Sequence, residues 1–388
     1  MGKIRNPFVI KGKVPMEYFC DRDEDTNLLV KRVRNGHNIV LMSPRRIGKT
    51  GLIEHCFDVP EIADNYYTFF VDILQTSSLR EFTYSLGRQI FDMLKPLGSK
   101  VLDGFIHTVR SISAEYGYDA QTGLPKFNFS LGAMSNPECT LEEIFKYIDK
   151  AEKRCLVAID EFQQIANYPE KNIEAILRTH IQHCSNADFI FAGSERHILE
   201  EMFNSYARPF YASATCMTLN ELPIDKYVAF VIDHFAEFGK VIADADVESV
   251  YKLFSGNTYC MQKTFNVAFD MTGARSKCTC EILYKAIDDI LLENERTYQG
   301  RLSQLSSKPK ELLYAIAVDG IAEKLTSGEF IRRHRLASAS SVQSAIKQLQ
   351  DNDWITYRVA DNGDKSYYLS DHFLMLWIKK NFGWGYQL

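Results

Sequence analysis

The sequence predicts an α/β fold: a parallel sheet flanked by helices, then a helical bundle and a small C-terminal domain of three helices and a hairpin. Apolar runs suited to strands buried on both faces lie at 38–42, 154–162 and 187–194, and helical patterns follow them. Residues 223–293 have helical periodicity almost throughout. Residues 354–369 contain two strand-like segments joined through Asn-Gly, which is a hairpin signal.

The first apolar run leads directly into residues 43–50, SPRRIGKT, which open a helical pattern. A turn between a buried strand and a helix presents backbone N–H groups and the positive end of the helix dipole to phosphates. We expect Lys49 to reach the β- and γ-phosphates of a nucleotide and the Thr50 hydroxyl to ligate Mg²⁺. Ser43 replaces the first glycine of the G-x-x-x-x-G-K-[ST] pattern and turns less freely. A surface loop that happens to contain Gly-Lys-Thr is the alternative.

The second apolar run, residues 154–162, ends in the acidic pair Asp160 and Glu161. Open α/β sheets bind their ligands at the carboxyl ends of the strands, so this pair lies where a nucleotide is expected. Asp160 would hold Mg²⁺, and Glu161 would polarise the attacking water. An acidic pair that only caps the next helix is the alternative. The phosphate loop earlier in the chain makes nucleotide hydrolysis the better interpretation.

The third apolar run, residues 187–194, ends in Ser194, one helix after the acidic strand. This hydroxyl would hydrogen-bond the γ-phosphate or the attacking water. Small polar residues also end many strands for local reasons, so both interpretations stay open.

Several segments together resemble the AAA+-like ATPases that are abundant in archaea, close to the STAND class of signalling ATPases. The resemblance covers most of the chain, from about 6 to 377. Its most specific parts are the Arg-Arg-x-Gly-Lys-Thr loop and the Asp-Glu-Phe run. The segments are FCDRDE at 19–24, SPRRIGKT at 43–50, VAIDEFQ at 157–163, FAGSE at 191–195, ARPFY at 207–211 and LFSGNT at 253–258.

The resemblance implies a P-loop ATPase with a helical lid, with ATP and Mg²⁺ as ligands. Segment 19–24 is expected to lie against the adenine, Arg208 to sense the γ-phosphate from the same or a neighbouring subunit, and Gly256 to begin a lid helix. An ordinary surface or core-bridging arginine is the alternative for Arg208. Tyr259 lies where the family has a proline. The expected nucleotide-binding residues are Arg22, Asp23, Ser43, Arg45, Arg46, Ile47, Gly48, Lys49, Thr50 and Gly51, the last standing where a second hydroxyl residue is common.

The length of 388 residues, with 46% hydrophobic and 24% charged residues, suits two or three globular domains. We expect an ATPase core at 1–220 with an insertion at 97–140, a helical lid at 221–300 and a winged helix at 301–388. A net charge of −5 gives no overall attraction to nucleic acid or to anionic membranes. No apolar stretch is long enough to span a bilayer and no signal peptide is evident, so we expect a cytoplasmic protein. Nine scattered cysteines agree with a reducing compartment.

Local signals predict individual elements. A first helix is expected at 23–35 with Leu28, Leu29 and Val33 on its buried face, and a short hairpin strand at 127–131. Thr140 is the expected N-cap of a helix at 141–153.

The C-terminal domain is expected to be a winged helix, with helices at 309–319 and 340–351 and with Ser327 capping the one between them. A third helix in the major groove would read DNA, but such domains also pack on the ATPase or bind proteins. The third helix has only Lys347 as a basic residue, and four aspartates surround the wing. The basic residues that would meet phosphates are Arg332, Arg333, Arg335, Lys347, Arg358 and Lys365.

Two functions follow from these observations. The first is an ATP-driven switch whose output passes through the winged helix to DNA or to a protein partner, with a homo-oligomer that depends on nucleotide. The second is a binding module with low turnover that uses ATP as a structural clamp. A DNA-modifying enzyme has no nuclease or metal cluster in the sequence to support it.

Overall fold

The computed structural model describes residues 6–94, 114–118, 125–129, 136–359, 363–382 and 386. The chain divides into two compact units. The sheet unit comprises Arg22–Asn220 with the short segment Lys13–Met16. The helical unit comprises Glu221–Leu388 with Met1–Gly12 and Glu17–Asp21.

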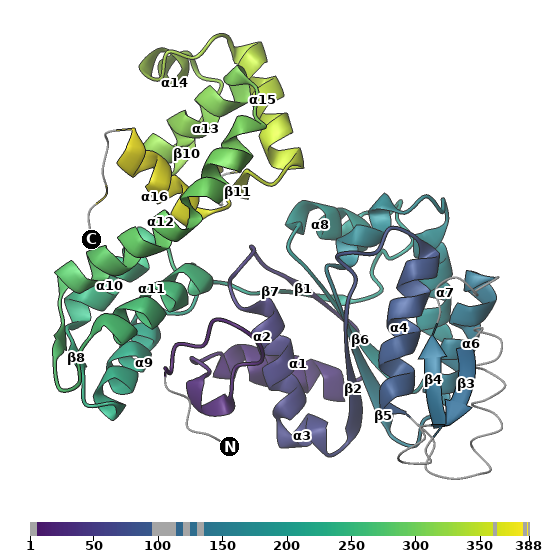
Figure 1. Cartoon of the computed structure of the whole chain (residues 1–388). Coiled ribbons are helices and arrows are strands. Elements are labelled where there is room, and N and C mark those ends of the chain that lie inside the picture. Colours follow the sequence, from purple (N-terminus) through teal and green to yellow (C-terminus); the bar gives the residue numbers. More distant parts are fainter. Residues whose placement is uncertain are drawn as a thin grey trace. The chain divides into compact units, whose positions relative to one another are not determined.

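A parallel sheet forms the centre of the sheet unit (Figure 1). Its strand order is β2-β5-β6-β1-β7, and register pairs Asp72 with Asp160 and Met42 with Gly193. The carboxyl ends of neighbouring strands therefore lie at one edge of the sheet. The strands are β1 (Ile39–Met42), β2 (Tyr66–Asp72), β5 (Arg154–Asp160), β6 (Ala187–Gly193) and β7 (Thr215–Thr218).

Helices bury both faces of this sheet, which explains why the strands read as unbroken apolar runs. Val40 and Met42 of β1 pack into one core and Ile39 and Leu41 into the other, as the alternation of side chains along a strand requires. The first core contains residues of α4 (Leu79–Met93), α6 (Pro137–Asp149), α7 (Ile173–His183), α8 (Arg196–Asn204) and the short helix η3 (Phe162–Asn167). The second contains residues of α1 (Asp23–Arg34), α2 (Lys49–Asp58) and α3 (Pro60–Ala63).

Two local predictions were wrong. Leu28 is 40% exposed, and α1 buries Thr26 and Val30 beside the predicted Leu29 and Val33, because the buried stripe runs one position further round the helix. Thr140 does not cap a helix. Asn136 caps α6, accepting hydrogen bonds from the backbone of Glu138 and Cys139, because Pro137 suits the first turn and starts the helix earlier. Thr140 lies buried within α6, where its hydroxyl donates to the Asn136 carbonyl.

A hairpin of β3 (Ala114–Tyr118) and β4 (Pro125–Phe129) belongs to the predicted insertion at 97–140. The predicted strand at 127–131 therefore coincides with β4 as far as residue 129. Residues 130–131 and the rest of the insertion up to 135, apart from the two strands, lie outside the described residues.

The helical unit contains the predicted bundle at 223–293. Phe8 from the N-terminal arm is fully buried in it and contacts the rings of Phe235, Phe265 and Phe269. Two short parallel strands interrupt the helices, β8 (Val241–Ile242) and β9 (Lys277–Cys278). The helices are α9 (Ile224–Glu237), α10 (Asp244–Leu253), α11 (Thr258–Met271) and α12 (Cys280–Ser303).

The C-terminal part of the helical unit has the predicted three helices and wing (Figure 1). Ser327 caps the second helix by accepting from the Phe330 N–H, as predicted. The turn residues 360–362 lie outside the described residues. The elements are α13 (Ser307–Asp319), β10 (Ala322–Glu323), α14 (Gly328–Arg333), α15 (Ala339–Asp351), β11 (Ile355–Val359), β12 (Lys365–Leu369) and α16 (His372–Asn381), with β12 central in the small sheet.

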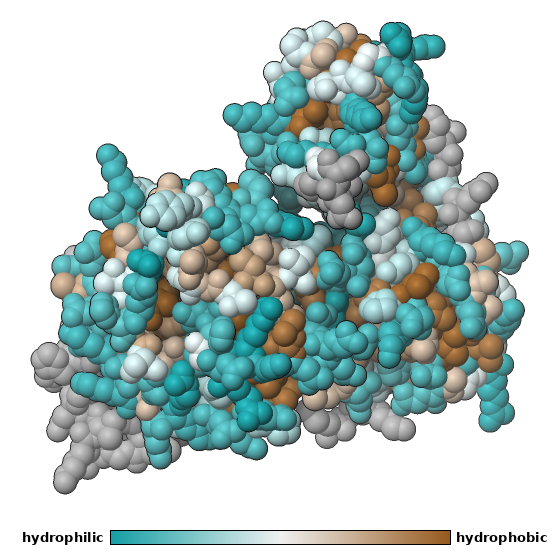
Figure 2. All heavy atoms as spheres, turned by 180° about the vertical axis from the view of Figure 1, so that it is seen from behind, coloured by the Kyte–Doolittle hydropathy of each residue, from teal (hydrophilic) through white to brown (hydrophobic). Residues whose placement is uncertain are grey.

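The face of the molecule in Figure 2 is mainly hydrophilic, with hydrophobic side chains scattered through it. This is the ordinary surface of a globular protein, because apolar residues never fit entirely inside. Within the described part of the chain, no helix has the length and apolar character needed to cross a membrane.

Candidate active site

The phosphate loop connects β1 to α2 with two residues of positive φ, Arg46 at 66° and Gly48 at 100°. Glycine adopts the second value without strain, which explains Gly48 directly before the helix. Ser43 is fully buried and is not among the residues of positive φ, so serine fits where a glycine is usual. Its hydroxyl donates to the Pro44 carbonyl at 3.1 Å.

The side chain of Arg22 is hydrogen-bonded to the phosphate loop. Its guanidinium is buried and donates to the carbonyl of Ile47 at 3.1 Å and to the carbonyl of Asn220 at 2.7 Å. The same group forms an ion pair with Asp25 at 3.0 Å. Arg22 therefore ties the phosphate loop to the chain that follows β7. The neighbouring Asp23 begins α1, where a carboxylate is favourable to the helix dipole.

Lys49 and Thr50, at the start of α2, meet the acidic pair at the end of β5. The Lys49 ammonium lies 3.3 Å from Asp160 Oδ1 and 3.6 Å from Glu161 Oε1. The Thr50 hydroxyl donates to Asp160 Oδ2 at 2.9 Å. Lys49 and Asp160 are each less than a tenth exposed. The structure therefore brings together the four residues that the two sequence motifs contributed separately.

Glu161 is the centre of a hydrogen-bonded network with residues from three other segments. Its Oε2 accepts from the Ser194 hydroxyl at 2.9 Å and from the Gln163 amide at 2.5 Å. The Arg45 guanidinium of the phosphate loop donates to the Ser194 hydroxyl at 3.1 Å. Ser194 thus lies beside the acidic pair, and its contact with phosphate or water stays a prediction.

The pKa of the Glu161 carboxyl reflects this network. Burial raises it, but the charge of Lys49 and the hydrogen bonds from Gln163 and Ser194 lower it more, so that the pKa lies below its ordinary value. Glu161 is therefore ionised at neutral pH. A carboxylate of low pKa orients a water molecule well but is a weak proton acceptor.

Gln163 is a residue of this site to which sequence reasoning gave no role. It is buried, and a Cβ at Gly193 would lie 2.0 Å from its Oε1. Gly193 therefore leaves the space in which Gln163 reaches Glu161. The signal was present in the sequence as a glycine that ends a buried strand, where a larger residue would otherwise be expected.

Arg208 lies in a different cluster. Its guanidinium forms ion pairs with Glu174 at 2.6 Å and Glu201 at 3.3 Å, from α7 and α8. Burial raises the pKa of the Glu174 carboxyl, and the charge of Arg208 only partly offsets this. Within the described residues, the ion pairs of Arg208 do not include Asp160 or Glu161. The arrangement of this single chain favours the core-bridging interpretation of Arg208.

Gly256 belongs to the helical unit and has φ of 73°. A Cβ there would lie 2.8 Å from Cβ of Glu221, so both conformation and packing require glycine. Asn257 then caps α11 by accepting from the Cys260 N–H. The predicted start of a helix after Gly256 is present, and a contact of this segment with nucleotide stays a prediction.

A sequence profile described as an ATPase domain predominantly from Archaea matches residues 19–263, which is more than half of the chain. The protein belongs to this ATPase family. A second profile, described as a probable winged helix domain, matches residues 296–380 of the ATPase. Both parts of the predicted resemblance to archaeal-type ATPases are thereby confirmed, and the relationship to the STAND class stays a prediction. No curated protein matches the chain.

Solved structures resemble the ATPase over nearly its whole length. The Walker-type ATPase PABY2304 of Pyrococcus abyssi has a TM-score of 0.65 at 18% identity, covering 96% of this chain and 99% of that one. The ORC2 protein of Aeropyrum pernix, in ADPNP-ADP complexes, has a TM-score of 0.60 at 13% identity, covering 98% and 99%. The ORC1 protein of the same organism, in complex with DNA, has a TM-score of 0.52 at 14% identity, covering 97% of each. At these identities the likeness establishes the fold, a P-loop ATPase sheet followed by a winged helix.

Proposed function

We propose that the protein is a Mg²⁺-dependent, ATP-hydrolysing molecular switch whose conformational change passes through the winged helix to DNA or to a protein partner. The observation that carries this proposal is the convergence of Lys49, Thr50, Asp160 and Glu161 at the carboxyl edge of the sheet. A triphosphate on the loop would place its β- and γ-phosphates within reach of Lys49.

The oxygen donors beside the loop suit a magnesium ion. The Thr50 hydroxyl and the Asp160 carboxylate share a 2.9 Å hydrogen bond, so both already point to one place. Mg²⁺ is usually held by one or two protein oxygens, with water and phosphate supplying the others. Thr50 and Asp160 would hold it here, directly or through water, and the ion would supply neutralisation of the phosphate charge.

Nucleotide binding is an exchange of partners for Lys49. Before binding, the ammonium is neutralised by Asp160 and Glu161. Phosphate oxygens replace these carboxylates, and Glu161 then keeps only the hydrogen bonds from Ser194 and Gln163. Loss of the lysine charge raises the pKa of Glu161 and makes it a better acceptor for the proton of an attacking water.

Contacts on both sides of the unit boundary support a relay. In the sheet unit, Arg22 joins the phosphate-loop carbonyl of Ile47 to the carbonyl of Asn220. In the helical unit, the very next residue, Glu221, forms an ion pair with Arg358 on β11 of the winged helix. A movement of the loop would therefore reach, through one peptide bond, a residue bound to the wing.

Glu161→Gln is the decisive variant. The amide keeps the size of the side chain but cannot serve as a carboxylate, so we expect hydrolysis to fall by at least about 100-fold while ATP stays bound. Turnover by phosphate release and affinity by calorimetry measure the two effects. Unchanged turnover would refute the role of Glu161.

The alternative is a binding module with low turnover that uses ATP as a structural clamp. The clamp and the switch differ in one measurement. A clamp retains its bound ATP over many minutes in a single-turnover assay, whereas a switch converts it to ADP and changes its winged-helix interactions.

DNA is one of the two partners that the proposal gives to the winged helix. The exposed face of α15 carries Ser344, Lys347 and Gln348, which suit a groove, but Arg358 is already paired with Glu221. Residues 301–388 contain twelve Lys and Arg against nine Asp and Glu, so the positive excess is small. A duplex shifted by the full-length protein, weakened by salt and by Lys347→Ala, would support DNA as the target. No shift at low salt would leave a protein partner.

Assembly decides whether Arg208 acts on a neighbouring subunit. We expect light scattering to show a larger particle with a non-hydrolysable ATP analogue than without nucleotide. Under that result, Arg208→Ala would lower turnover of the assembly. A monomer in both conditions would leave Arg208 with its core-bridging role alone.

A further inference from the structure

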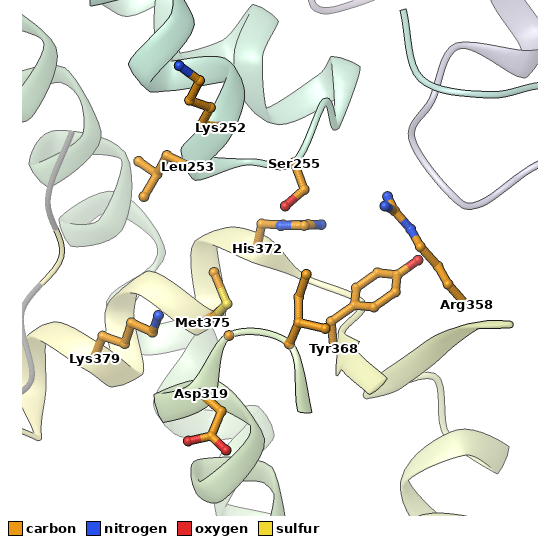
Figure 3. Close-up of a pocket in the computed structure, with 11 residues that line it drawn as sticks. Lys252, Leu253, Ser255, Asp319, Arg358, Tyr368, His372, Met375 and Lys379 are labelled. Carbon is orange, nitrogen blue, oxygen red and sulfur yellow. The ribbon is translucent and has the colours of Figure 1, made fainter. Parts of the chain in front are cut away.

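A cavity of about 340 Å³ lies in the helical unit, away from the phosphate loop in sequence (Figure 3). It is lined from α10, the turn after it, the end of α13 and the strands and last helix of the winged helix. Both the lid bundle and the winged helix therefore contribute to its wall. Its size falls in the range of cavities that bind small molecules. The lining residues used below are Leu253, Ser255, Ile321, His372, Met375 and Lys379.

The charged residues around the cavity differ in sign and in whether an ion pair neutralises them. Lys252 pairs with Glu248, and Arg358 pairs with Glu221. Asp319, the acidic residue in the wall, pairs with Arg333 and His334. In the part of the chain that the structure describes, Lys379 alone among these three cations forms no ion pair or hydrogen bond, although the charge of Asp319 acts on it from a longer distance.

Lys379 is half-buried, so its ammonium is partly removed from water. Burial lowers the pKa of Lys379, and the charge of Asp319 offsets this only in part. A Cβ built at Gly320 would lie 3.4 Å from the ammonium, so the group sits beside the C-terminal end of α13. The helix dipole favours a cation there, which explains why the position is tolerated. The three N–H donors nevertheless remain available.

The rest of the wall has two kinds of surface. Leu253, Ile321 and Met375 provide apolar contacts. Figure 3 shows the Ser255 hydroxyl directed toward the ring of His372, and the Lys379 ammonium near Met375. Ser255 has φ of 49°, a conformation that serine seldom adopts, and it immediately precedes Gly256. This left-handed residue directly follows the C-cap of α10, a place where helices commonly end in such a conformation, and Ser255 lines the cavity there.

We propose that this cavity binds a small organic anion, with its carboxylate or phosphate group on Lys379 and its apolar body against Leu253, Ile321 and Met375. The anion supplies the ion-pair partner that Lys379 lacks, in a place where partial burial of the ammonium strengthens the interaction. Because the wall comes from both the lid bundle and the winged helix, an occupied cavity fixes one to the other. The site stands independently of nucleotide hydrolysis.

Benzoate and phenyl phosphate are suitable probes, because each joins one anionic group to one apolar ring. Titrations of the full-length protein, followed by NMR of the ligand and by calorimetry, should show binding of at least one of them at millimolar concentration. Benzamide, which has the same ring without the charge, should bind at least about tenfold more weakly. The preference between the two anions identifies the head group as a carboxylate or a phosphate.

Variants separate this cavity from other sites. Lys379→Met should weaken probe binding by about tenfold or more, as expected for loss of a charge-assisted hydrogen bond. Lys380→Met is the matched control, since Lys380 is the adjacent residue and pairs with Asp288 outside the cavity. Lys49→Met should leave the affinity for benzoate unchanged, which excludes the phosphate loop as the binding site.

Ile321→Trp gives an independent test. Ile321 is 52% exposed, so its replacement leaves the core intact, while the indole fills the cavity. The variant should lose probe binding and keep its melting temperature. Probes that bind wild type, Lys379→Met and Ile321→Trp with equal affinity would overturn the proposal, as would the absence of binding by both anions.

Discussion

Two lysines of this molecule occupy opposite electrostatic situations. Lys49, in the phosphate loop, is less than a tenth exposed and lies within 3.6 Å of two carboxylates. Lys379, in the winged helix, is half-buried and has no ion pair among the described residues. The first cation is compensated by the protein before any ligand arrives. The second leaves its compensation to a ligand.

The difference determines what each site gains from a ligand. At Lys49, binding replaces two existing partners, so affinity depends on how much better phosphate oxygens are than carboxylates. At Lys379, binding creates the first partner, so even a weakly interacting anion relieves the unfavourable burial of the charge. The comparison predicts that replacing Lys49 greatly weakens ligand binding. It also predicts that replacing Lys379 raises the free energy of unfolding, whereas most substitutions lower it.

Lys49→Met should give the largest effect. Without the ammonium, the β- and γ-phosphates lose their charged donor, and Asp160 and Glu161 repel them at close range. We expect the affinity for ATP to fall by at least about 100-fold, measured by calorimetry with Mg²⁺ present.

Lys380→Met is the matched control for this loss, because Lys380 lies on the surface of α16 in an ion pair with Asp288. Its affinity for ATP should stay within about twofold of wild type, as for other exposed pairs. Equal affinities in Lys49→Met and wild type would remove Lys49 from the nucleotide site and, with it, the contrast between the two lysines.

Arg22 extends the comparison to a cation whose partners are all within the protein. Arg22→Met removes the hydrogen bonds that the guanidinium donates to the carbonyls of Ile47 and Asn220, and it removes the ion-pair partner of Asp25. We expect the free energy of unfolding to fall by about 3 kcal/mol in urea titrations. Arg34→Met, at an exposed position of the same helix, should change it by less than about 0.5 kcal/mol.

Sequence patterns were sufficient to predict the site residues whose positions are set by the order of strands, turns and helices along the chain. A buried strand, a turn with Gly48 and a helix place Lys49 and Thr50 together, and parallel pairing places Asp160 and Ser194 at the same edge. The role of Gln163 was not predicted, because it depends on space left by Gly193 on another strand. The partners of Arg208 were missed for the same reason, since Glu174 and Glu201 come from two different helices. Side-chain contacts between distant elements have no periodic signal in one sequence.

Gly193→Ala should affect Glu161, one of the two carboxylates that pair with Lys49, by displacing Gln163. A methyl group would lie 2.0 Å from Gln163 Oε1, the movable end of a side chain, so Gln163 should shift while the fold persists. Glu161 then loses one of the hydrogen bonds that hold its carboxylate in place, and we expect poorer orientation of the attacking water to lower the rate of ATP hydrolysis about tenfold. Gln163→Ala should reproduce this loss. Gly300→Ala, where nothing lies within 4 Å of the new methyl group, should leave the rate unchanged.

Lys379→Met should have the smallest effect. On the free energy of unfolding, its sign should be opposite to that of Lys49→Met, which leaves Asp160 and Glu161 without their cation. Removing the unpaired ammonium should raise the free energy of unfolding at pH 7 by roughly 0.5 kcal/mol, whereas Lys380→Met should not. Because the pKa of Lys379 is lower in the folded chain, the unfolded chain binds more protons between that value and the ordinary lysine pKa. Wild type therefore gains stability as pH rises through this window, and the advantage of the variant should disappear there. An advantage that persists at high pH would mean that packing, rather than the lone charge, separates the two lysines.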